Sequence, residues 1–283
     1  MTDAFHKDCQ IFTEAGHTSQ LTAYYESARR IVWLMMHTHP RPSFNPALLD
    51  DVEAVFRAVR DSKLPIDFFI SGSTVPHMYN TGGDLSLFSQ AIRQRQRAVL
   101  SSYATRCIDI LCHLDGGFGR NVITLALVEG SALGGGFEAA LAHHYLLAQR
   151  DAKMGFPEIS FNLFPGMGAY SFVGRKAGQR VAEQLISSGE APRAPWHHEV
   201  GLADQLFEPG EGVMAARTFI DTLQPRMNGI RAMLRARHRV FPIHREELMD
   251  ITQDWVDTAL SVEDKDIAYM ERLVQLQNKR TRA

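Results

Sequence analysis

Three glycines followed by a carboxylate stand out in Leu133-Gly134-Gly135-Gly136-Phe137-Glu138, which comes soon after an apolar run. Glycines let the backbone turn sharply and let a ligand approach it closely. If a helix begins here, its free N–H groups and the positive end of its dipole suit a developing oxyanion. Glu138 would then lie at the rim of the same pocket. A tight strand-to-helix turn with a solvated Glu138 explains the segment equally well, and the spacing is not the GxGxxG of a dinucleotide site.

A second carboxylate, Glu158, stands among apolar side chains in Met154-Gly155-Phe156-Pro157-Glu158-Ile159. Burial disfavours the charged form of a carboxylate, so it raises the pKa towards the range used in general acid/base catalysis. The alternative is a structural carboxylate that caps a turn.

The third candidate segment is Asn80-Thr81-Gly82-Gly83-Asp84-Leu85. Its two glycines lie between a predicted strand and a predicted helix, where they could offer a backbone N–H group to a ligand. Asp84 could cap the helix that follows. An ordinary strand-to-helix turn accounts for this segment equally well.

Predicted strands and helices alternate around these three segments. Apolar residues recur at helical spacing from 46 to 59, and one helix of mixed charge is predicted from 85 to 112. Strands that alternate with helices indicate an α/β fold with largely parallel pairing. The short apolar runs that predict buried strands are residues 31–36, 66–71, 122–128 and 145–148.

The strand signals stop after about Pro209, and helical periodicity continues to the end of the tail. A helical tail of this length must cover either its own domain or a neighbouring subunit. We therefore divide the chain into a catalytic core, residues 1–210, and a C-terminal helical region, residues 211–283. The predicted helices of the tail are residues 211–224, 227–240, 244–261 and 263–279.

The composition excludes several other classes of protein. The 283 residues carry a net charge of −2, which argues against a nucleic-acid partner, and no apolar run is long enough for a membrane span. Three cysteines without a CxxC pair indicate free thiols, and the first residues lack the features of a signal peptide, so we expect a cytoplasmic protein. The adjacent pairs His143-His144 and His197-His198 point apart, so no metal site is predicted.

Together the three segments resemble one known family. The order N-T-G-G-D-L, A-L-G-G-G-F-E and G-F-P-E-I is similar to the crotonase (enoyl-CoA hydratase/isomerase) superfamily over about residues 30–210. The resemblance implies an α/β crotonase-like spiral of ββα repeats with a C-terminal helical region. It places the oxyanion hole on the backbone N–H groups of Gly83 and Gly135. It also makes Glu138 and Glu158, which have the spacing of the hydratases, the acid/base pair.

Less generic motifs carry a closer resemblance. G-G-D-L-S-L-F, F-P-G-M-G-A-Y-S-F and D-W-V-D-T-A-L look like the diffusible signal factor synthases of bacteria. Those enzymes convert a 3-hydroxyacyl thioester on acyl carrier protein into a cis-2-unsaturated fatty acid used for quorum sensing. The segment after Gly189 departs from the common pattern, which leaves its local structure open. The alternatives are an enoyl-CoA hydratase of fatty-acid degradation and a non-catalytic binding module with the same fold.

The resemblance implies a lyase that dehydrates its substrate and also hydrolyses the thioester. Gly83 and Gly135 would bind the thioester carbonyl, Glu158 would remove the C2 proton, and Glu138 would protonate the departing 3-hydroxyl. Attack of water on the thioester could then reuse the same oxyanion hole. No cofactor is needed, the substrate is bound to acyl carrier protein or CoA, and the implied assembly is a homotrimer or a dimer of trimers.

A medium-to-long acyl chain needs an apolar tunnel, because each buried CH₂ group contributes about 0.8 kcal/mol. Leu133 and Met167 adjoin the motif residues and are expected to border this pocket. We hypothesise that the tail folds over the site and that Trp255 lines or ends the tunnel, although helix packing would explain Trp255 equally well. The basic stretch Arg93–Arg97 is either a solvated helix face or a contact for phosphates or an acidic carrier protein.

Overall fold

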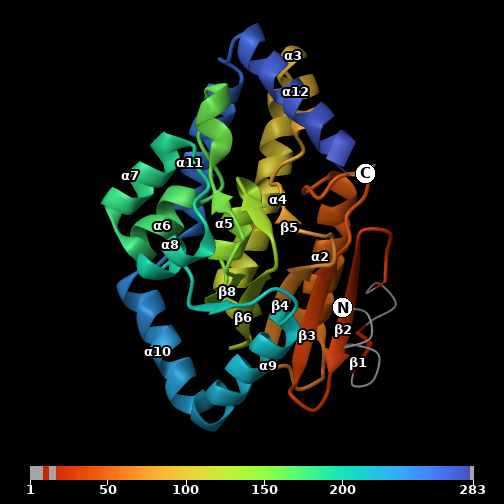
Figure 1. Ribbon diagram of the computed structural model, residues 1–283, viewed down its shortest axis with the longest axis vertical. Helices are drawn as coiled ribbons and strands as arrows, with labels where there is room; N and C mark the ends of the chain where they lie inside the picture. Colours follow the sequence, from red (N-terminus) through yellow and green to blue (C-terminus); the bar gives the residue numbers. More distant parts are fainter. Residues whose placement is uncertain (1–8, 13–16, 281–283) are drawn as a thin grey trace.

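The main sheet has seven strands in the computed structural model, which describes residues 9–12 and 17–280 (Figure 1). Its strand order is β1-β2-β3-β4-β6-β8-β10. The first three strands pair antiparallel, and the pairs from β3 onward are parallel. The bounds are β1 Cys9–Ile11, β2 Leu21–Glu26, β3 Ile31–Met36, β4 Phe68–Ser73, β6 Ile123–Val128, β8 Tyr145–Gln149 and β10 Gln205–Phe207.

A second sheet of three short parallel strands, in the order β5-β7-β9, completes the spiral. Three times the chain forms a strand of the main sheet, then a strand of the second sheet, then a helix. This repetition is the predicted ββα spiral, so the expected fold class is confirmed. The elements are β5 Met78–Asn80 before α3 Leu85–Arg93, β7 Ser131–Leu133 before α5 Gly135–Leu141, and β9 Met154–Gly155 before the 3₁₀ helix η3 Pro157–Phe161.

Helix α2, Pro46–Asp61, buries the apolar stripe that predicted it. Asn45 caps its N-terminus by accepting a hydrogen bond from Leu48 N, and Pro46 occupies the first turn, where a missing N–H costs nothing. The remaining helices of the core are α6 Ala169–Ala177, α7 Gln179–Ser188 and α8 Ala194–Glu199. Helix α8 and strand β10 occupy the segment after Gly189 whose structure the sequence left open.

The prediction of a single helix from 85 to 112 is wrong. Helix α3 ends at Arg93, and α4, Arg97–Asp115, begins after a break in which Arg95 has a φ of 50°. Left-handed backbone of this kind cannot continue a right-handed helix. The break also has no apolar side chain that could hold a continuous helix against the core. The predicted strand at 66–71 likewise begins later, at Phe68, after Pro65 and Ile66.

The C-terminal helices pack on different parts of the core: α9 lies against strands β6 and β8, whereas α11 packs on α4 and α12 on α3 (Figure 1). Helices α9 and α10 supply Ile220 and Leu234 to the cluster that contains Trp33, whereas α11 and α12 supply Val256 and Met270 to the larger cluster of the core. The division of the chain near residue 210 stays a prediction. In the described residues no helix has the length and apolarity needed to cross a membrane. The bounds are α9 Gly212–Leu223, α10 Met227–Val240, α11 Arg245–Ala259 and α12 Asp264–Arg280.

Candidate active site

The three segments singled out in the sequence meet because each directly follows a strand of the second sheet. Strands β5, β7 and β9 are adjacent and parallel, so their carboxyl ends lie at one edge of the sheet. The chain leaves these ends at Thr81, Gly134 and Phe156. Segments that are about 50 and 20 residues apart in the sequence therefore lie side by side, next to a cavity of about 920 Å³ that we call the outer cavity.

The backbone donors of the site are held by close contact between two glycine loops. Gly82 has a φ of 91°, and a β-carbon there would lie 2.8 Å from Gly135 N. Asn80 Oδ1 accepts a hydrogen bond of 2.7 Å from Gly82 N, which fixes the first loop. Gly135 is the first residue of α5, so its N–H group has no partner within the helix. Gly83 and Gly135 both line the outer cavity, where their N–H groups can bind one carbonyl oxygen.

Glu138 lies in the first turn of α5 and is only 2% exposed. Its Oε1 accepts hydrogen bonds from Met167 N at 2.8 Å and from Ala169 N at 2.9 Å. Burial raises the pKa of Glu138 to about 7, and these two N–H donors limit the rise because they stabilise the ionised form. The carboxyl is therefore positioned rigidly and can change its protonation state near neutral pH.

Glu158 lies in η3, and its carboxyl is next to Gly134 in the wall of the outer cavity. Gly134 has a φ of 51°, which favours glycine, and a β-carbon there would displace the Glu158 carboxyl from its present position. Within the described residues, the buried Oε2 of Glu158 has no hydrogen-bond partner. Burial, together with the charge of Glu138, raises the pKa of Glu158 to about 8. At neutral pH the pair therefore favours a proton on Glu158 and the negative charge on Glu138, where two N–H groups stabilise it.

Asp84 has the structural role that the sequence allowed for it. Its carboxylate accepts hydrogen bonds from Ser86 N at 3.0 Å and Leu87 N at 3.3 Å, so it caps α3. It also forms an ion pair with Arg41 at 3.1 Å.

Leu133, Met167 and Trp255 all line the outer cavity, and α12 of the tail lies beside α3 (Figure 1). The Trp255 ring packs against Phe88 with 5.1 Å between ring centroids, and a β-carbon on Gly166 would collide with Trp255. Trp255 thus borders the cavity and also joins α11 to the core. Helix α12 contributes further wall residues, which are Tyr269, Leu273, Leu276 and Gln277.

The basic stretch Arg93–Arg97 holds the tail in place. Arg93 binds Glu271 at 2.9 Å and Asp264 at 3.3 Å, and Arg97 forms an ion pair with Asp257. These contacts connect the break between α3 and α4 with α11 and α12, so the two arginines already have acidic partners within the chain.

The sequence analysis did not find a buried polar network beneath the site. Ser71 Oγ lies 2.8 Å from Tyr79 Oη and 2.9 Å from His143 Nε2, and His143 Nδ1 donates to Ala139 O at 2.8 Å. The network joins β4 and β5 to the end of α5, and burial lowers the pKa of His143 to about 3. His143 is thus a neutral structural residue. Across the described chain, no three His, Cys, Asp or Glu side chains gather in a way that could hold a metal ion.

Comparisons with known proteins agree with this geometry. The model of the enoyl-CoA hydratase/isomerase family matches residues 27–272. The Arabidopsis thaliana peroxisomal fatty acid beta-oxidation multifunctional protein AIM1 is 29% identical over 139 residues, which is 49% of this chain and 19% of that protein. The alpha subunit of the Acinetobacter baylyi fatty acid oxidation complex is 28% identical over 54% of this chain and 20% of its own length. The chain thus spans about a fifth of these curated relatives.

Solved structures share the same fold at low identity. Human mitochondrial delta3-delta2-enoyl-CoA isomerase superposes with a TM-score of 0.77 and 14% identity, over 92% of this chain and 99% of that chain. The structure of Pseudomonas aeruginosa DspI superposes with a TM-score of 0.64 and 20% identity, over 85% and 95%.

The fold and the site combine an α/β spiral with two backbone N–H donors and a buried carboxylate pair. Since the family model covers most of its length, the chain belongs to the enoyl-CoA hydratase/isomerase family.

Proposed function

We propose that this chain adds water across the C2=C3 bond of a 2-enoyl thioester and catalyses the reverse dehydration of the 3-hydroxyacyl thioester. The observation that carries this proposal is the geometry of the buried pair, in which Met167 N and Ala169 N donate to Glu138 while Oε2 of Glu158 has no partner among the described residues. Hydration needs a carboxylate to activate water and a carboxylic acid to protonate C2. The geometry favours this state, because two backbone N–H groups stabilise a negative charge on Glu138, whereas burial and the neighbouring Glu138 raise the pKa of Glu158.

Each step then has a group in place. The N–H groups of Gly83 and Gly135 bind the thioester carbonyl and stabilise the enolate that forms when water attacks C3. Glu138 takes the proton of that water, and Glu158 gives its proton to C2, so the product is neutral and the pair has exchanged one proton. Dehydration runs through the opposite state, in which Glu158 is the base and Glu138 the acid. The reaction forms or breaks one C–O bond and one C–H bond without net oxidation or reduction of the substrate, so it needs no redox cofactor.

A spectrophotometric assay of 2-enoyl-CoA hydration tests this function, with E138Q and E158Q as the variants. We expect each substitution to lower kcat by two to four orders of magnitude, which is about the contribution of one general acid or base. Folding is checked by circular dichroism. Hydration at the wild-type rate by both folded variants would contradict the assignment of the pair.

A second candidate is the release of a 2-unsaturated fatty acid from a 3-hydroxyacyl carrier protein, as in the diffusible signal factor synthases. The curated relatives favour the hydratase reading over this one. However, no lysine or arginine lines the described part of the outer cavity, where His77 is the only basic residue. The phosphates of CoA would find few cationic partners there, whereas a carrier protein presents pantetheine without a nucleotide.

Product analysis separates the two candidates. The purified chain is given the same 3-hydroxyacyl group on CoA and on acyl carrier protein, and the products are analysed by mass spectrometry. A free unsaturated acid supports the synthase, and an enoyl thioester alone supports the hydratase. If neither thioester is converted, the non-catalytic binding module becomes the better reading, although the complete set of donors and carboxylates argues against it.

We also infer a homotrimer or a dimer of trimers that uses the C-terminal helices. Several apolar side chains on and beside α10 face solvent, with Met233 52% exposed and Phe241 55% exposed. Such side chains are expected to be covered by another subunit. Sedimentation velocity tests the assembly. The cytoplasmic location stays a prediction.

A further inference from the structure

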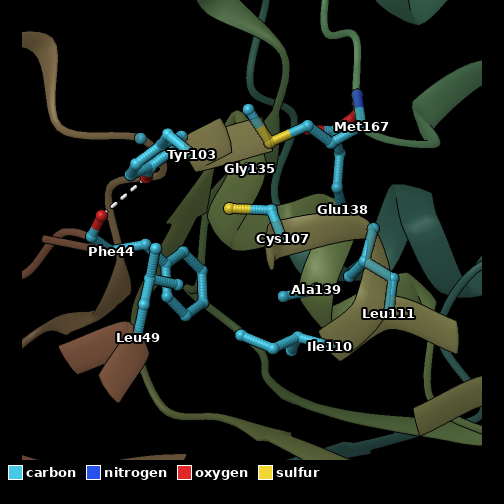
Figure 2. Close-up of a pocket in the computed structure, with 11 residues that line it drawn as sticks. Phe44, Leu49, Tyr103, Cys107, Ile110, Leu111, Gly135, Glu138, Ala139 and Met167 are labelled. Carbon is cyan, nitrogen blue, oxygen red and sulfur yellow. Dashed lines mark hydrogen bonds between the residues drawn. The ribbon is translucent and has the colours of Figure 1, made fainter. Parts of the chain in front are cut away.

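A second, smaller cavity lies behind the oxyanion donors (Figure 2). It shares Gly83, Gly135, Glu138 and Met167 with the outer cavity, so the two meet at the place where the thioester carbonyl binds. We call it the inner chamber. Its other walls are Ala139 of α5 and side chains of α2, α4 and the segment before α2, namely Phe44, Leu49, Tyr103, Cys107, Ile110 and Leu111.

The inner chamber is apolar and enclosed by buried side chains. None of its wall side chains is more than 9% exposed, whereas Leu276 in the wall of the outer cavity is 50% exposed. The Tyr103 hydroxyl donates to Phe44 O at 2.6 Å and is therefore not free to bind a ligand. Burial raises the pKa of Cys107 to about 12, so its thiol stays neutral. Apart from Glu138 at its entrance, the chamber offers a ligand mainly hydrocarbon surface.

The walls of the inner chamber are fixed in position. Tyr103, Cys107, Ile110 and Leu111 recur at helical spacing and form one face of α4. Arg106 on the same helix binds Glu53 at 2.6 Å and Asp50 at 2.5 Å, which joins α4 to α2 across the chamber. The chamber has a volume of about 20 Å³, compared with about 920 Å³ for the outer cavity. The chamber therefore has room for roughly one water-sized group.

Building on the proposed function, we propose that the inner chamber receives the methyl end of the acyl chain, and that Ile110 and Cys107 set the longest chain accepted. An acyl thioester has two arms. The pantetheine arm must lead to solvent, because its far end is attached to a carrier. The outer cavity reaches solvent and has room for this arm, and its mainly apolar wall includes polar groups such as Ser131 and Ser160 that the pantetheine amides can contact. The hydrocarbon arm then turns into the buried, apolar chamber.

The test compares Ile110→Ala with Ile108→Ala. Both isoleucines are buried on α4, but Ile108 does not line the chamber, so its variant controls for lost packing. The measured quantity is the ratio of kcat/KM for an enoyl thioester two carbons longer than the wild-type optimum to kcat/KM at that optimum. Each buried CH₂ contributes about fourfold, so Ile110→Ala should raise the ratio about fifteenfold. Ile108→Ala should leave it unchanged.

Two further variants make the result decisive. Cys107→Met fills the chamber and should shift the optimum to shorter chains. Trp255→Ala opens the outer cavity. A shifted length preference in Trp255→Ala with none in folded Ile110→Ala would overturn the proposal and place the chain beneath the tail. An unchanged preference in both folded variants would also overturn it.

A binding assay keeps this test independent of turnover. The ligands are unreactive S-alkyl pantetheine thioethers of increasing length, and calorimetry gives the ratio of their Kd values for each variant. If the wild type catalyses no reaction but Ile110→Ala shifts this ratio, the proposed function fails and the chamber assignment stands. If the wild type hydrates enoyl thioesters but the ratio never shifts, the chamber assignment fails alone. A wild type that binds no thioether overturns it as well.

Discussion

The buried carboxyl of Glu138 should make the folded chain less stable as the pH rises. Its pKa is about 7 in the folded chain, against 4.5 for an ordinary glutamate. Between these two values the folded state keeps the proton while the unfolded state releases it, so stability falls with increasing pH across this window and levels off above about pH 7. The difference of about 2.5 between the two pKa values, at 1.36 kcal/mol each, gives about 3 kcal/mol.

Glu138→Gln removes this dependence. The glutamine cannot ionise, but its amide oxygen can still accept the hydrogen bonds from Met167 N and Ala169 N. We therefore expect the free energy of unfolding of E138Q, relative to the wild type, to increase by about 3 kcal/mol between pH 4.5 and pH 8. The same substitution removes catalysis, so activity and stability change in opposite directions at high pH.

Urea unfolding at equal protein concentration measures this difference. The charge of Glu138 also raises the pKa of Glu158, so the comparison is repeated in the E158Q background, where only Glu138 of the pair titrates. A difference between E138Q and its parent that varies by less than 1 kcal/mol from pH 4.5 to pH 8 would show that Glu138 ionises normally, and the argument about the proton on the pair would be wrong.

Three other predictions concern the same site. The pH profile of kcat/KM for hydration should be bell-shaped with its maximum between about pH 7 and pH 8, because Glu138 must be ionised and Glu158 protonated; a flat profile from pH 6 to pH 9 would exclude this pair. Gly135→Val should lower kcat about 10²–10³-fold by blocking a backbone donor, and any thioester hydrolysis should fall with it; hydrolysis at the wild-type rate would rule out a shared oxyanion hole. Trp255→Ala should lower the free energy of unfolding by about 3–5 kcal/mol, because it empties space beside Phe88 and Gly166, and a loss below 1 kcal/mol would show that the tail does not depend on this contact.

The three segments that meet at the cavity could be recognised in the sequence because their glycines and carboxylates form distinctive local patterns, and the catalytic roles of these residues stay predictions. Gly82 and Gly136, the neighbours of Gly83 and Gly135, are required because a β-carbon at either position would collide with backbone atoms. Runs of adjacent glycines of this kind can be recognised in a single sequence. The strand after residue 31 and the helix after Asn45 were also found, because each buries a continuous or periodic apolar pattern.

Other features depend on contacts between residues far apart in the chain. The arginines on either side of the break at Arg95 form ion pairs with acidic side chains more than 150 residues later, which no local pattern reveals. The hydrogen bond between Ser71 and His143 joins residues 72 positions apart. The sequence analysis considered His143 and His144 only as possible metal ligands and therefore did not predict this bond. The inner chamber was missed for a similar reason, since the spacing of Cys107 and Ile110 is that of any buried helix face.

The attachment of α12 has a consequence for local unfolding. The first half of the helix is held by buried Ile267 and Met270 and by the ion pair between Arg93 and Glu271, whereas Leu276 in the second half is 50% exposed. Exposed ion pairs contribute about 0–1 kcal/mol each and are screened by salt. The backbone amides near Leu276 should therefore exchange with deuterium well before those of the main sheet, and faster in high salt. A ligand in the outer cavity contacts this helix, so it should slow the exchange there while leaving the exchange of α10 unchanged.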